Sequence, residues 1–390
     1  MYRVCLYRPT KKCNLSCRYC YSELNNPDKE ELENWDCVRT LKHLVTKFVR
    51  PSKFIFLGGE TTEVGIDKFS EMCEILKSSE YVKSIALQTN ALNINEEWIK
   101  LFEKYKVRIG TSYDGPVSYR QLKGGIDASH LIKERILWMG DRMVETLGEA
   151  YRPKIITQLI PLVPIEELVE DLIDFKTDIE ARVPYNFSSG DKLAKKLGYS
   201  CNAEYYSHWL NYAPRKLYEA GGLVDQTIQH MIAGIHDKEK LIRVCEFIEC
   251  TLMKEFIICV DGAGDVYPCN TLANPNYKLG NIFVDDFWDV KYSDKYISMQ
   301  KRYKAIFDGV CKGCPVWGAC FGGCYGDISS MDGRPTKCDS IKVLYYNTLH
   351  MMNTDKELYK YYYNRHKRAS ERLVQYSEYK EEINKSDELL

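Results

Sequence analysis

The sequence predicts an α/β fold in which a partial (β/α)6 TIM-like barrel precedes a small cysteine-rich domain and a helical tail. Short apolar runs alternate with amphipathic segments through the first half of the 390 residues. Alternation of this kind is typical of a parallel sheet with outer helices. Polar motifs follow several of these runs, at the strand ends where such barrels carry functional residues. Most of the 16 cysteines gather in two fields, one near residue 13 and one after residue 245.

Taken in order, the apolar runs predict six strands, and apolar residues at helical spacing predict the helices between them. The strands are expected over residues 4–7, 54–57, 85–87, 107–111, 154–160 and 181–185, and the helices over residues 30–49, 69–76, 97–102, 131–144 and 166–175. Further helices are expected over residues 205–217, 224–235 and 341–352, and a hairpin is expected to begin with the strand 256–260.

These elements divide the chain into four parts. We expect the barrel over residues 1–190, a helical bridge over 191–240, the cysteine-rich domain over 241–345 and the helical tail over 346–390. Charged residues and tyrosines interleave through residues 359–379 of the tail. This pattern favours a solvated helix over a helix that covers the barrel mouth or contacts a partner.

Composition and charge exclude several classes of function. The formal net charge is −1, so no basic surface indicates binding to nucleic acid. The sequence lacks the run of about 18 apolar residues that predicts a membrane span, and the strand-like run at residues 4–7 argues against a signal peptide. In a long chain of this kind, clustered cysteines indicate metal ligands rather than disulfides. We therefore expect a cytoplasmic protein in a reducing, oxygen-poor setting.

The first cysteine field is a short loop with the spacing C-x3-C-x2-C, formed by Cys13, Cys17 and Cys20. Three thiolates on one loop can hold three irons of a [4Fe–4S] cluster, which leaves the fourth iron open. A structural zinc loop or a chance cluster is the alternative. With the aromatic Tyr19 before its last cysteine, the loop resembles that of the radical SAM superfamily. The resemblance implies that the open iron chelates S-adenosylmethionine, and that one electron cleaves it to a 5′-deoxyadenosyl radical.

Two motifs after the second and third expected strands resemble cofactor-binding motifs of the same superfamily. Gly58-Gly59-Glu60 resembles the GGE motif, in which the glycines let backbone carbonyls approach a ligand and the carboxylate meets the methionine ammonium group. A tight turn is the alternative. Gln88-Thr89-Asn90-Ala91 resembles the family's Q-T-N-G, in which polar side chains face the ribose and the methionine carboxylate. Ala91 stands where the family has glycine, which leaves the turn geometry open.

Further candidates follow the fourth strand and lie on the fifth. Ser112 and Asp114 match the S-x-D-G-P stretch of the family, which implies that Ser112 contacts the ribose or the carboxylate of S-adenosylmethionine. Asp114 is a weak candidate for a catalytic base, and the alternative is that it starts the turn at Gly115-Pro116. Leu159 and Ile160 are expected to pack on the adenine, with a plain core position as the alternative for both.

The second cysteine field resembles the SPASM domain, the auxiliary-cluster domain of some radical SAM enzymes, over residues 245–340. From Cys250 the spacing is C-x13-G-x4-C, followed by C-x2-C-x5-C-x3-C and a lone cysteine. Two zinc knuckles are the alternative, because C-x2-C is also a zinc spacing. The resemblance implies an outer and an inner [4Fe–4S] cluster, which makes three clusters in the chain. The implied ligands are Cys311, Cys314, Cys320 and Cys338 for the outer cluster, and Cys269 and Cys324 for the inner one.

Two further ligands of the inner cluster must come from Cys245, Cys250 and Cys259. Cys259 lies within the apolar strand 256–260, whereas the other two lie in a stretch less committed to a strand. We therefore assign Cys245 and Cys250 to the cluster and Cys259 to packing. Isolated cysteines are expected to pack as small apolar residues, and these are Cys5, Cys37, Cys73 and Cys201.

The resemblance implies an oxidoreductase that modifies a peptide by a cross-link or another oxidation, as in the maturation of ribosomally made peptides (RiPPs). It also implies a reductant such as flavodoxin or ferredoxin. The sulfatase-maturing branch is an alternative, although it carries an Asp base where this chain has Asn270 and tends to have Gln where this chain has Leu57. Small-molecule dehydrogenation is another. A chain that only carries electrons through iron–sulfur clusters is the non-enzyme alternative, but it would need no cofactor pocket at Glu60, Asn90 and Ser112.

Overall fold

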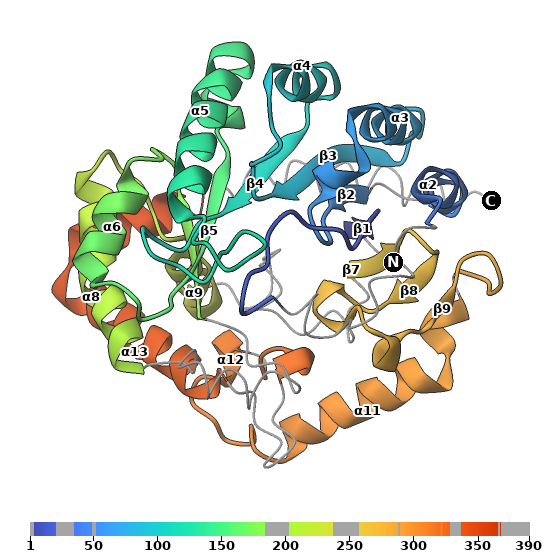
Figure 1. Cartoon of the computed structure of the whole chain (residues 1–390). Helices are drawn as coiled ribbons and strands as arrows, with labels where there is room; N and C mark the ends of the chain where they lie inside the picture. Colours follow the sequence, from blue (N-terminus) through green and yellow to red (C-terminus); the bar gives the residue numbers. More distant parts are fainter. Residues whose placement is uncertain are drawn as a thin grey trace, which may run out of the picture.

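The computed structural model describes residues 4–20, 35–48, 52–183, 203–236, 257–287, 289–320, 322–327, 337–365 and 367. Within these ranges, nine strands form one sheet in the order β6-β5-β4-β3-β2-β1-β7-β8-β9, which curves like the wall of a barrel (Figure 1). The strands are β1 (Val4–Arg8), β2 (Ser52–Phe56), β3 (Val82–Thr89), β4 (Arg108–Ser112), β5 (Lys154–Gln158), β6 (Ile179–Arg182), β7 (Ile257–Asp261), β8 (Asp265–Tyr267) and β9 (Gly280–Asn281). Short 3-10 helices occupy Thr61–Val64, Glu149–Tyr151, Asn270–Leu272, Pro275–Tyr277, Asp289–Tyr292 and Tyr325–Asp327.

β1 to β6 confirm the expected α/β barrel. Each strand pairs in parallel with the next one along the chain, and helices cover the outer face of the sheet (Figure 1). These helices are α2 (Cys37–Val45), α3 (Ile66–Lys77), α4 (Glu96–Tyr105), α5 (Ser129–Leu147) and α6 (Ile165–Ile173).

α2 begins later than the helix expected over residues 30–49. Asp36 caps it, because the Asp36 side chain accepts a hydrogen bond from the Arg39 backbone amide at 3.0 Å. Residues 21–34, which include the start of the expected helix, lie outside the described residues.

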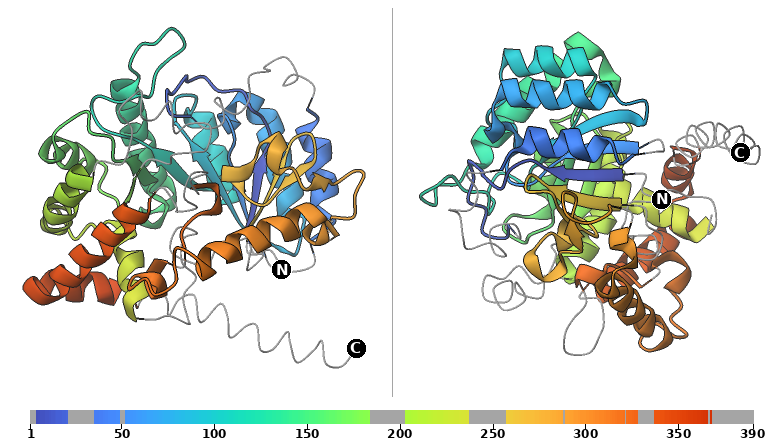
Figure 2. Two further views of the ribbon diagram at one scale, coloured as in Figure 1. Left: turned by 90° about the horizontal axis from the view of Figure 1, so that it is seen from below. Right: turned by 90° about the vertical axis from the view of Figure 1, so that its right-hand side faces the viewer.

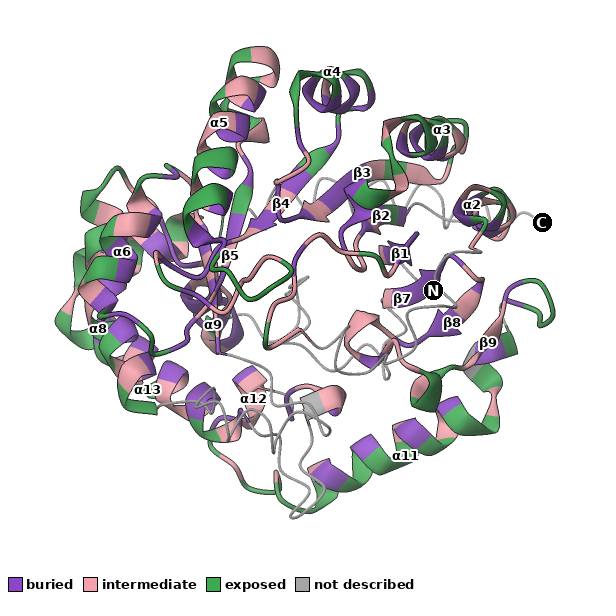
Figure 3. Cartoon of the chain, viewed as in Figure 1, coloured by how far each residue is buried: buried purple, intermediate pink, exposed green. Residues whose placement is uncertain are grey.

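The two faces of the sheet differ in burial (Figure 3). Phe54 and Phe56 of β2 face the helices without exposed surface, and their rings lie 5.0 and 4.9 Å from those of Phe48 and Phe69. Successive side chains of a strand point to opposite faces, and the alternate positions of β2 are exposed or half-buried. β4 and β5 show the same alternation. Along β2, β4 and β5 the inner face of the barrel is therefore more accessible to solvent than the outer face, whereas β1 is buried on both faces.

The cysteine-rich region shares this sheet. β7 pairs in parallel with β1 along five residues, from Val4 opposite Ile257 to Arg8 opposite Asp261, and Figure 2 shows the two strands side by side. Gly264, at φ 89°, makes the turn into antiparallel β8. α11 (Asp294–Asp308) and α12 (Trp317–Cys320) lie across the barrel from β3 and β4 (Figure 1).

The tail packs against the helical bridge, so the expectation of a solvated helix is wrong for the part of the tail that is described. Residues 356–365 form a helix beside α8 (Ala203–Glu219), and α9 (Gln226–His236) follows α8. Leu358 and Tyr362, at i and i+4, are 3% and 0% exposed, because residues at this spacing share one helix face. Arg365 forms a salt bridge of 2.7 Å with Asp178. α13 (Cys338–Thr354) runs unbroken across the domain boundary expected between residues 345 and 346.

Asp225 joins the tail helix to the edge of the sheet. Its carboxylate accepts hydrogen bonds from the Trp209 indole and the Thr227 backbone amide, both at 2.8 Å. Its own backbone N–H donates to the Tyr362 hydroxyl at 3.0 Å. Burial raises the pKa of Asp225 to about 6. The group is buried, so each of these hydrogen bonds replaces water that cannot reach it.

We expect Tyr362→Phe to lower the free energy of unfolding by about 1–3 kcal/mol, because the buried amide of Asp225 loses its acceptor. Phenylalanine keeps the ring in place, so packing stays nearly unchanged. Tyr346→Phe is the matched control, because Tyr346 is 51% exposed. Anaerobic urea denaturation of the two variants measures the difference. Equal losses in both variants would contradict the role given to the Tyr362 hydroxyl.

Among the helices described, none has both the length and the apolar composition to cross a membrane.

Candidate active site

A second segment holds the cysteine loop, residues 13–20, in place. It is a hairpin-like loop, residues 117–128, between β4 and α5. The Ser16 amide donates to the Gln121 carbonyl at 2.6 Å, so the two segments pair through their backbones. Sequence reasoning missed this contact, although Gly124-Gly125, with φ 99° and 84°, marks a turn.

Gly58 and Gly59 bring the end of β2 against the segment that leads into the cysteine loop. The Gly59 amide donates to the Thr10 carbonyl at 3.1 Å, and the Glu60 amide donates to the Lys12 carbonyl at 2.7 Å. A Cβ on Gly59 would lie 2.1 Å from the Lys12 carbonyl oxygen. The glycines therefore allow close backbone packing here, and their contact with the methionine group stays a prediction.

The Glu60 carboxylate ties the ends of β2 and β3 together. It is buried and accepts hydrogen bonds from the Thr62 and Thr89 hydroxyls at 2.8 and 2.7 Å, and from the backbone amide of Asn90 at 2.8 Å. Burial raises the pKa of Glu60, and these hydrogen bonds oppose the increase. Glu60 thus positions the strand ends in this structure, while its predicted contact with an ammonium group stays a prediction.

Asn90 links the strand ends to the cysteine loop. Its side-chain amide donates to Asn14 Oδ1 at 2.7 Å, and Asn14 Nδ2 donates to Asn93 Oδ1 at 3.0 Å. Ala91 adopts φ 67°, so the turn for which the motif has glycine forms with alanine here. Sequence reasoning missed Asn14 and Asn93. The available signals were that Asn14 directly follows Cys13 and that Asn93 lies close to the Q-T-N motif.

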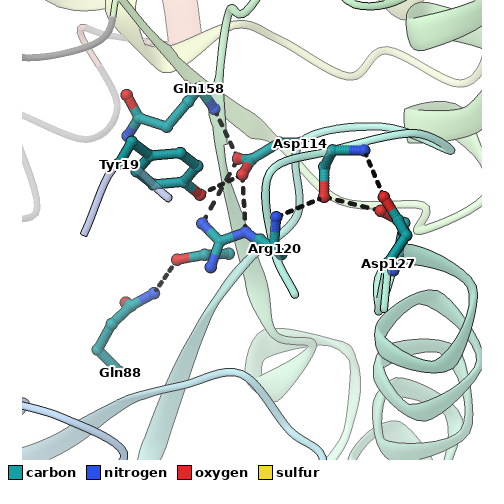
Figure 4. Close-up of polar contacts among 9 residues, drawn as sticks. Tyr19, Gln88, Asp114, Arg120, Asp127 and Gln158 are labelled. Carbon is teal, nitrogen blue, oxygen red and sulfur yellow. Dashed lines mark hydrogen bonds and ion pairs between the residues drawn. The ribbon is translucent and has the colours of Figure 1, made fainter. Parts of the chain in front are cut away.

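Gln88 and Ser112 meet on the inner face of the barrel, and Figure 4 shows the Gln88 side chain of this pair. Gln88 Nε2 donates to Ser112 Oγ at 3.0 Å. Gly110 makes room for this pair, because a Cβ there would lie 2.4 Å from Gln88 Oε1. Both side chains are half-buried, so they are accessible from inside the barrel. Their role in binding a cofactor stays a prediction.

Asp114 lies at the centre of a buried polar cluster (Figure 4). Its carboxylate accepts hydrogen bonds from the Tyr19 hydroxyl, from Arg120 Nε at 2.7 Å and from the backbone amide of Gln158 at 2.9 Å. Burial would lower the pKa of Arg120, but the Asp114 charge raises it overall. With these partners, Asp114 positions Tyr19 next to Cys20. The suggestion that Asp114 is a catalytic base stays untested.

β5 ends at Gln158, two residues earlier than expected. Leu159 and Ile160 are both buried, but they pack differently. Leu159 belongs to the main core, whereas Ile160 packs with Tyr19 and Tyr119 beside the cysteine loop. Ile160 is therefore the better placed of the two for the predicted contact with an adenine.

Cys13, Cys17 and Cys20 are half-buried. Burial raises the pKa of Cys13 to about 12 and that of Cys17 to about 11, and the other thiols of the loop add to these increases. Within the described ranges, no three ligand side chains converge closely enough to hold a single metal ion. A [4Fe–4S] cluster takes its thiolates on separate irons, so its ligands stand farther apart. Three thiols on one loop are the donor set that such a cluster needs.

The predicted ligands of the outer cluster come together from three segments. Cys311 and Cys314 share a turn, in which the Cys314 amide donates to the Cys311 carbonyl at 3.1 Å. Cys320 ends α12 and Cys338 begins α13. Burial raises the pKa of Cys320 to about 12, and the charges of the other three thiols add to it. The four thiols therefore lie near enough to one another for their charges to interact. Their assignment as ligands stays a prediction.

Cys269 and Cys324, the predicted ligands of the inner cluster, lie in loops that touch. Gly326 approaches Thr271 so closely that an added Cβ would lie 2.7 Å from the Thr271 side chain. Both cysteines are half-buried. The segments that carry the two thiols therefore lie against each other, and their shared ligation stays a prediction.

Cys259 is a packed strand residue, and its exclusion from the inner cluster stays a prediction. It lies in β7 without exposed surface and packs against Leu6 and Tyr267. Cys245 and Cys250, the ligands preferred over it, lie outside the described residues. The isolated cysteines Cys5, Cys37 and Cys73 are buried, as expected, and Cys201 also lies outside the described residues.

We expect Cys259→Ser to keep the full iron content and to lower the free energy of unfolding by about 1 kcal/mol, because a hydroxyl enters an apolar contact. Cys250→Ser, in contrast, should lower the iron content by disturbing the inner cluster. Iron analysis of anaerobically purified variants measures both. A holoenzyme structure with Cys259 Sγ about 2.3 Å from an iron, the distance typical of metal–thiolate bonds, would overturn the assignment.

Two family models match the chain. The Radical SAM superfamily model matches residues 7–175, and the SPASM model, an iron–sulfur cluster-binding domain, matches residues 250–315. The first match includes the cysteine loop at residues 13–20, and the second includes the part of the other cysteine field from Cys250 to Cys314.

Two relatives match most of the chain in sequence. The cysteine-type anaerobic sulfatase-maturating enzyme of Clostridium perfringens is 24% identical over 340 residues, which span 80% of this chain and 85% of the relative. The serine-type anaerobic sulfatase-maturating enzyme of Bacteroides thetaiotaomicron is 23% identical over 356 residues, which span 83% of each chain.

Two solved structures share the fold. The structure of anSMEcpe with bound AdoMet and Cp18Cys peptide has a TM-score of 0.69 at 18% identity, and the match covers 95% of this chain and 99% of that one. Streptococcus suis SuiB bound to the precursor peptide SuiA has a TM-score of 0.60 at 17% identity, with 87% of this chain and 75% of that one covered.

Proposed function

Because residues 7–175 place this chain in the radical SAM superfamily and residues 250–315 give it a SPASM domain, we propose that it is an oxidoreductase that modifies a peptide. S-adenosylmethionine and [4Fe–4S] clusters are the cofactors of these domains, and when bound they supply a radical that abstracts a hydrogen atom. The proposed product is a cross-link or another oxidised residue in a ribosomally made peptide.

The observation that carries this proposal is the pair of polar groups beside the cysteine loop. Gln88 and Ser112 lie 3.0 Å apart on the accessible inner face, where they can bind the ribose or the carboxylate of S-adenosylmethionine. The ion pair of Asp114 and Arg120 holds Tyr19 against Ile160. This arrangement gives the adenine an apolar surface next to the last cysteine of the loop.

A peptide is the proposed substrate class, because two proteins with this fold have been seen with peptides bound, anSMEcpe with Cp18Cys peptide and SuiB with its precursor peptide. A two-electron oxidation also needs an electron acceptor. The abstracted hydrogen atom carries away one of the two electrons. Cys269 and Cys324 would help to hold the [4Fe–4S] cluster that could accept the other. A flavodoxin or ferredoxin is the proposed reductant, and a reducing cytoplasm is the proposed compartment.

Sulfatase maturation is the second candidate, and the two relatives that match about four-fifths of the chain favour it. Asn270, directly after Cys269, argues against it, because an amide cannot accept a proton at neutral pH as the Asp of that branch does. Leu57, where that branch tends to have Gln, is a second departure. We therefore place peptide maturation first.

The test is an anaerobic reaction of the reduced holoenzyme with S-adenosylmethionine and the short peptide encoded beside its gene. Mass spectrometry should show a peptide lighter by a pair of hydrogen atoms, with 5′-deoxyadenosine formed in step. A formylglycine product from a sulfatase peptide would move the chain to the second candidate. An unchanged mass without uptake of solvent deuterium would exclude both oxidation and epimerisation. Failure to form any 5′-deoxyadenosine would leave only electron transfer.

A further inference from the structure

The inner face of the barrel carries a second polar group, at the opposite end of the strands from Gln88 and Ser112. It consists of Lys53 in β2, Arg108 in β4 and Lys154 in β5, which we call the cationic floor. Lys53 alternates with the helix-facing side chains of β2, and Arg108 and Lys154 alternate with those of β4 and β5. Because side chains alternate along a strand, all three belong to the inner face.

The cationic floor is open to solvent although it lies inside the barrel. All three residues are exposed, whereas the adjoining helix-facing residues Ile109 and Ile155 are 4% and 0% exposed. Burial lowers the pKa of Lys53, so protein surrounds a side chain that still has accessible surface. The two observations agree if Lys53 lines a water-filled space. A closed (β/α)8 barrel instead fills its interior with bulky side chains.

Within the part of the chain that the structure describes, the positive charge of the floor is only partly balanced, because no acid there forms an ion pair with it. Lys53 and Lys154 make no hydrogen bond or ion pair there, and Arg108 donates to the Ala150 carbonyl at 3.0 Å, a neutral acceptor. Glu180 of β6 is the neighbouring acid. Its charge attracts Lys154, but its direct partner is Arg182 on its own strand, with Nε at 2.8 Å from Oε1.

The three cations also lie close enough to repel one another. After burial, the charges of Lys154 and then Arg108 are the causes that lower the pKa of Lys53. Repulsion between like charges is a cost that a bound anion would relieve. Among the described residues, Glu180 attracts Lys154 but is already paired with Arg182. The repulsion at Lys53 therefore remains for a carboxylate of a ligand to relieve.

We propose that the cationic floor binds a carboxylate of the substrate, either an acidic side chain of the peptide or its C-terminus. The inference rests on the proposed function in that the ligand is part of the peptide to be modified. It adds a specificity determinant, because a peptide with an acidic group at the right spacing gains a charge-assisted contact that a neutral peptide lacks.

The distances along the strands fit this ligand. Lys154 lies opposite Gly110, and Ser112 is two residues farther along β4, which is roughly 7 Å at the rise of a strand. An extended peptide advances about 3.5 Å per residue. A peptide whose reacting residue lies near Ser112 can therefore place a carboxylate two or three residues away at the floor.

Binding can be tested without turnover by NMR of the reconstituted holoenzyme with its lysines labelled as 13C-dimethyl-lysine. The probes are N-acetylglutamate α-amide for a side-chain carboxylate, N-acetylglycine for a C-terminus, inorganic phosphate, and N-acetylglutamine amide as the neutral control. We expect at least one carboxylate probe to shift the Lys53 and Lys154 signals saturably, and the neutral probe to shift neither. Lys83, at the start of β3 on the outer face, should not respond.

Lys53→Gln and Lys154→Gln should each weaken the carboxylate probe roughly tenfold, the loss typical of one hydrogen bond to a charged group. Lys83→Gln is the matched control and should leave the affinity unchanged. Neither lysine forms a hydrogen bond or an ion pair within the described chain, and both are exposed, so we expect their replacement to leave the fold intact.

The proposal would be overturned if no carboxylate probe shifts the Lys53 and Lys154 signals, if the neutral probe shifts them equally, or if phosphate binds more tightly than both carboxylates. These results do not depend on catalysis. A peptide that is modified while the floor binds no carboxylate refutes only this inference. Carboxylate binding by an enzyme that modifies no peptide refutes only the proposed function.

Discussion

Replacing Cys13, Cys17 and Cys20 together by alanine is expected to abolish cleavage of S-adenosylmethionine and to remove about a third of the iron, because the three thiols are proposed to hold one of three clusters. The loop that carries them is fixed by the hairpin-like loop and by the end of β2, so the alanine variant should keep its backbone. Chromatography of 5′-deoxyadenosine after anaerobic reduction measures cleavage, and iron analysis measures the lost cluster.

Cys73→Ala is the control for this experiment, since Cys73 is a fully buried residue of α3. It should lower the free energy of unfolding but leave both the iron content and the cleavage of S-adenosylmethionine in place. A triple variant that still forms 5′-deoxyadenosine would show that the loop at residue 13 does not carry the cofactor chemistry.

Gly59→Ala is expected to reduce cleavage of S-adenosylmethionine roughly 100-fold, the cost of misplacing reacting groups by about 1 Å. The added Cβ would lie 2.1 Å from the Lys12 carbonyl oxygen and 2.5 Å from that of Lys11. Both atoms belong to backbone that leads directly into Cys13, so the cysteine loop must move away from Glu60. Rates of 5′-deoxyadenosine formation under saturating S-adenosylmethionine measure the effect.

Gly140→Ala provides the matched substitution. Its Cβ would meet the Pro153 ring at 3.7 Å, an ordinary contact, within α5, where alanine is the better helix former. This variant should cleave S-adenosylmethionine at the rate of the parent and unfold no more easily. Wild-type activity in Gly59→Ala would mean that the approach of β2 to the cysteine loop has no part in placing the cofactor.

The strands and the inner-face residues could be predicted because they leave local patterns. The strand expected at residues 107–111 corresponds to β4, Arg108–Ser112, and the strand expected at residues 154–160 corresponds to β5, Lys154–Gln158. In a parallel barrel, a polar residue that follows an apolar strand lies at the strand end where functional residues gather. For that reason Gln88 and Ser112 could each be predicted as a binding candidate from its own motif, and their side chains lie 3.0 Å apart.

Contacts between distant segments left no such pattern. Arg120 pairs with Asp114 at 2.7 Å across the hairpin-like loop, and nothing in their spacing distinguishes an ion pair from two solvated charges. The pairing of β1 with β7 joins residues about 250 positions apart, which no local periodicity encodes. The tail did carry a local signal of packing, because Leu358 and Tyr362 stand at i and i+4 on one helix face. Many charged residues surround the two, and they obscured this signal.

The pairing of β1 with β7 has a consequence for any shortened form of the chain. β7 covers the backbone edge of β1 along its whole length, and β1 is apolar from Val4 to Tyr7. A chain cut after the bridge would leave this edge bare, and an exposed apolar edge strand is a template for pairing with other chains. The auxiliary domain therefore protects the barrel from self-association, and the barrel is not a separable module that can be produced on its own.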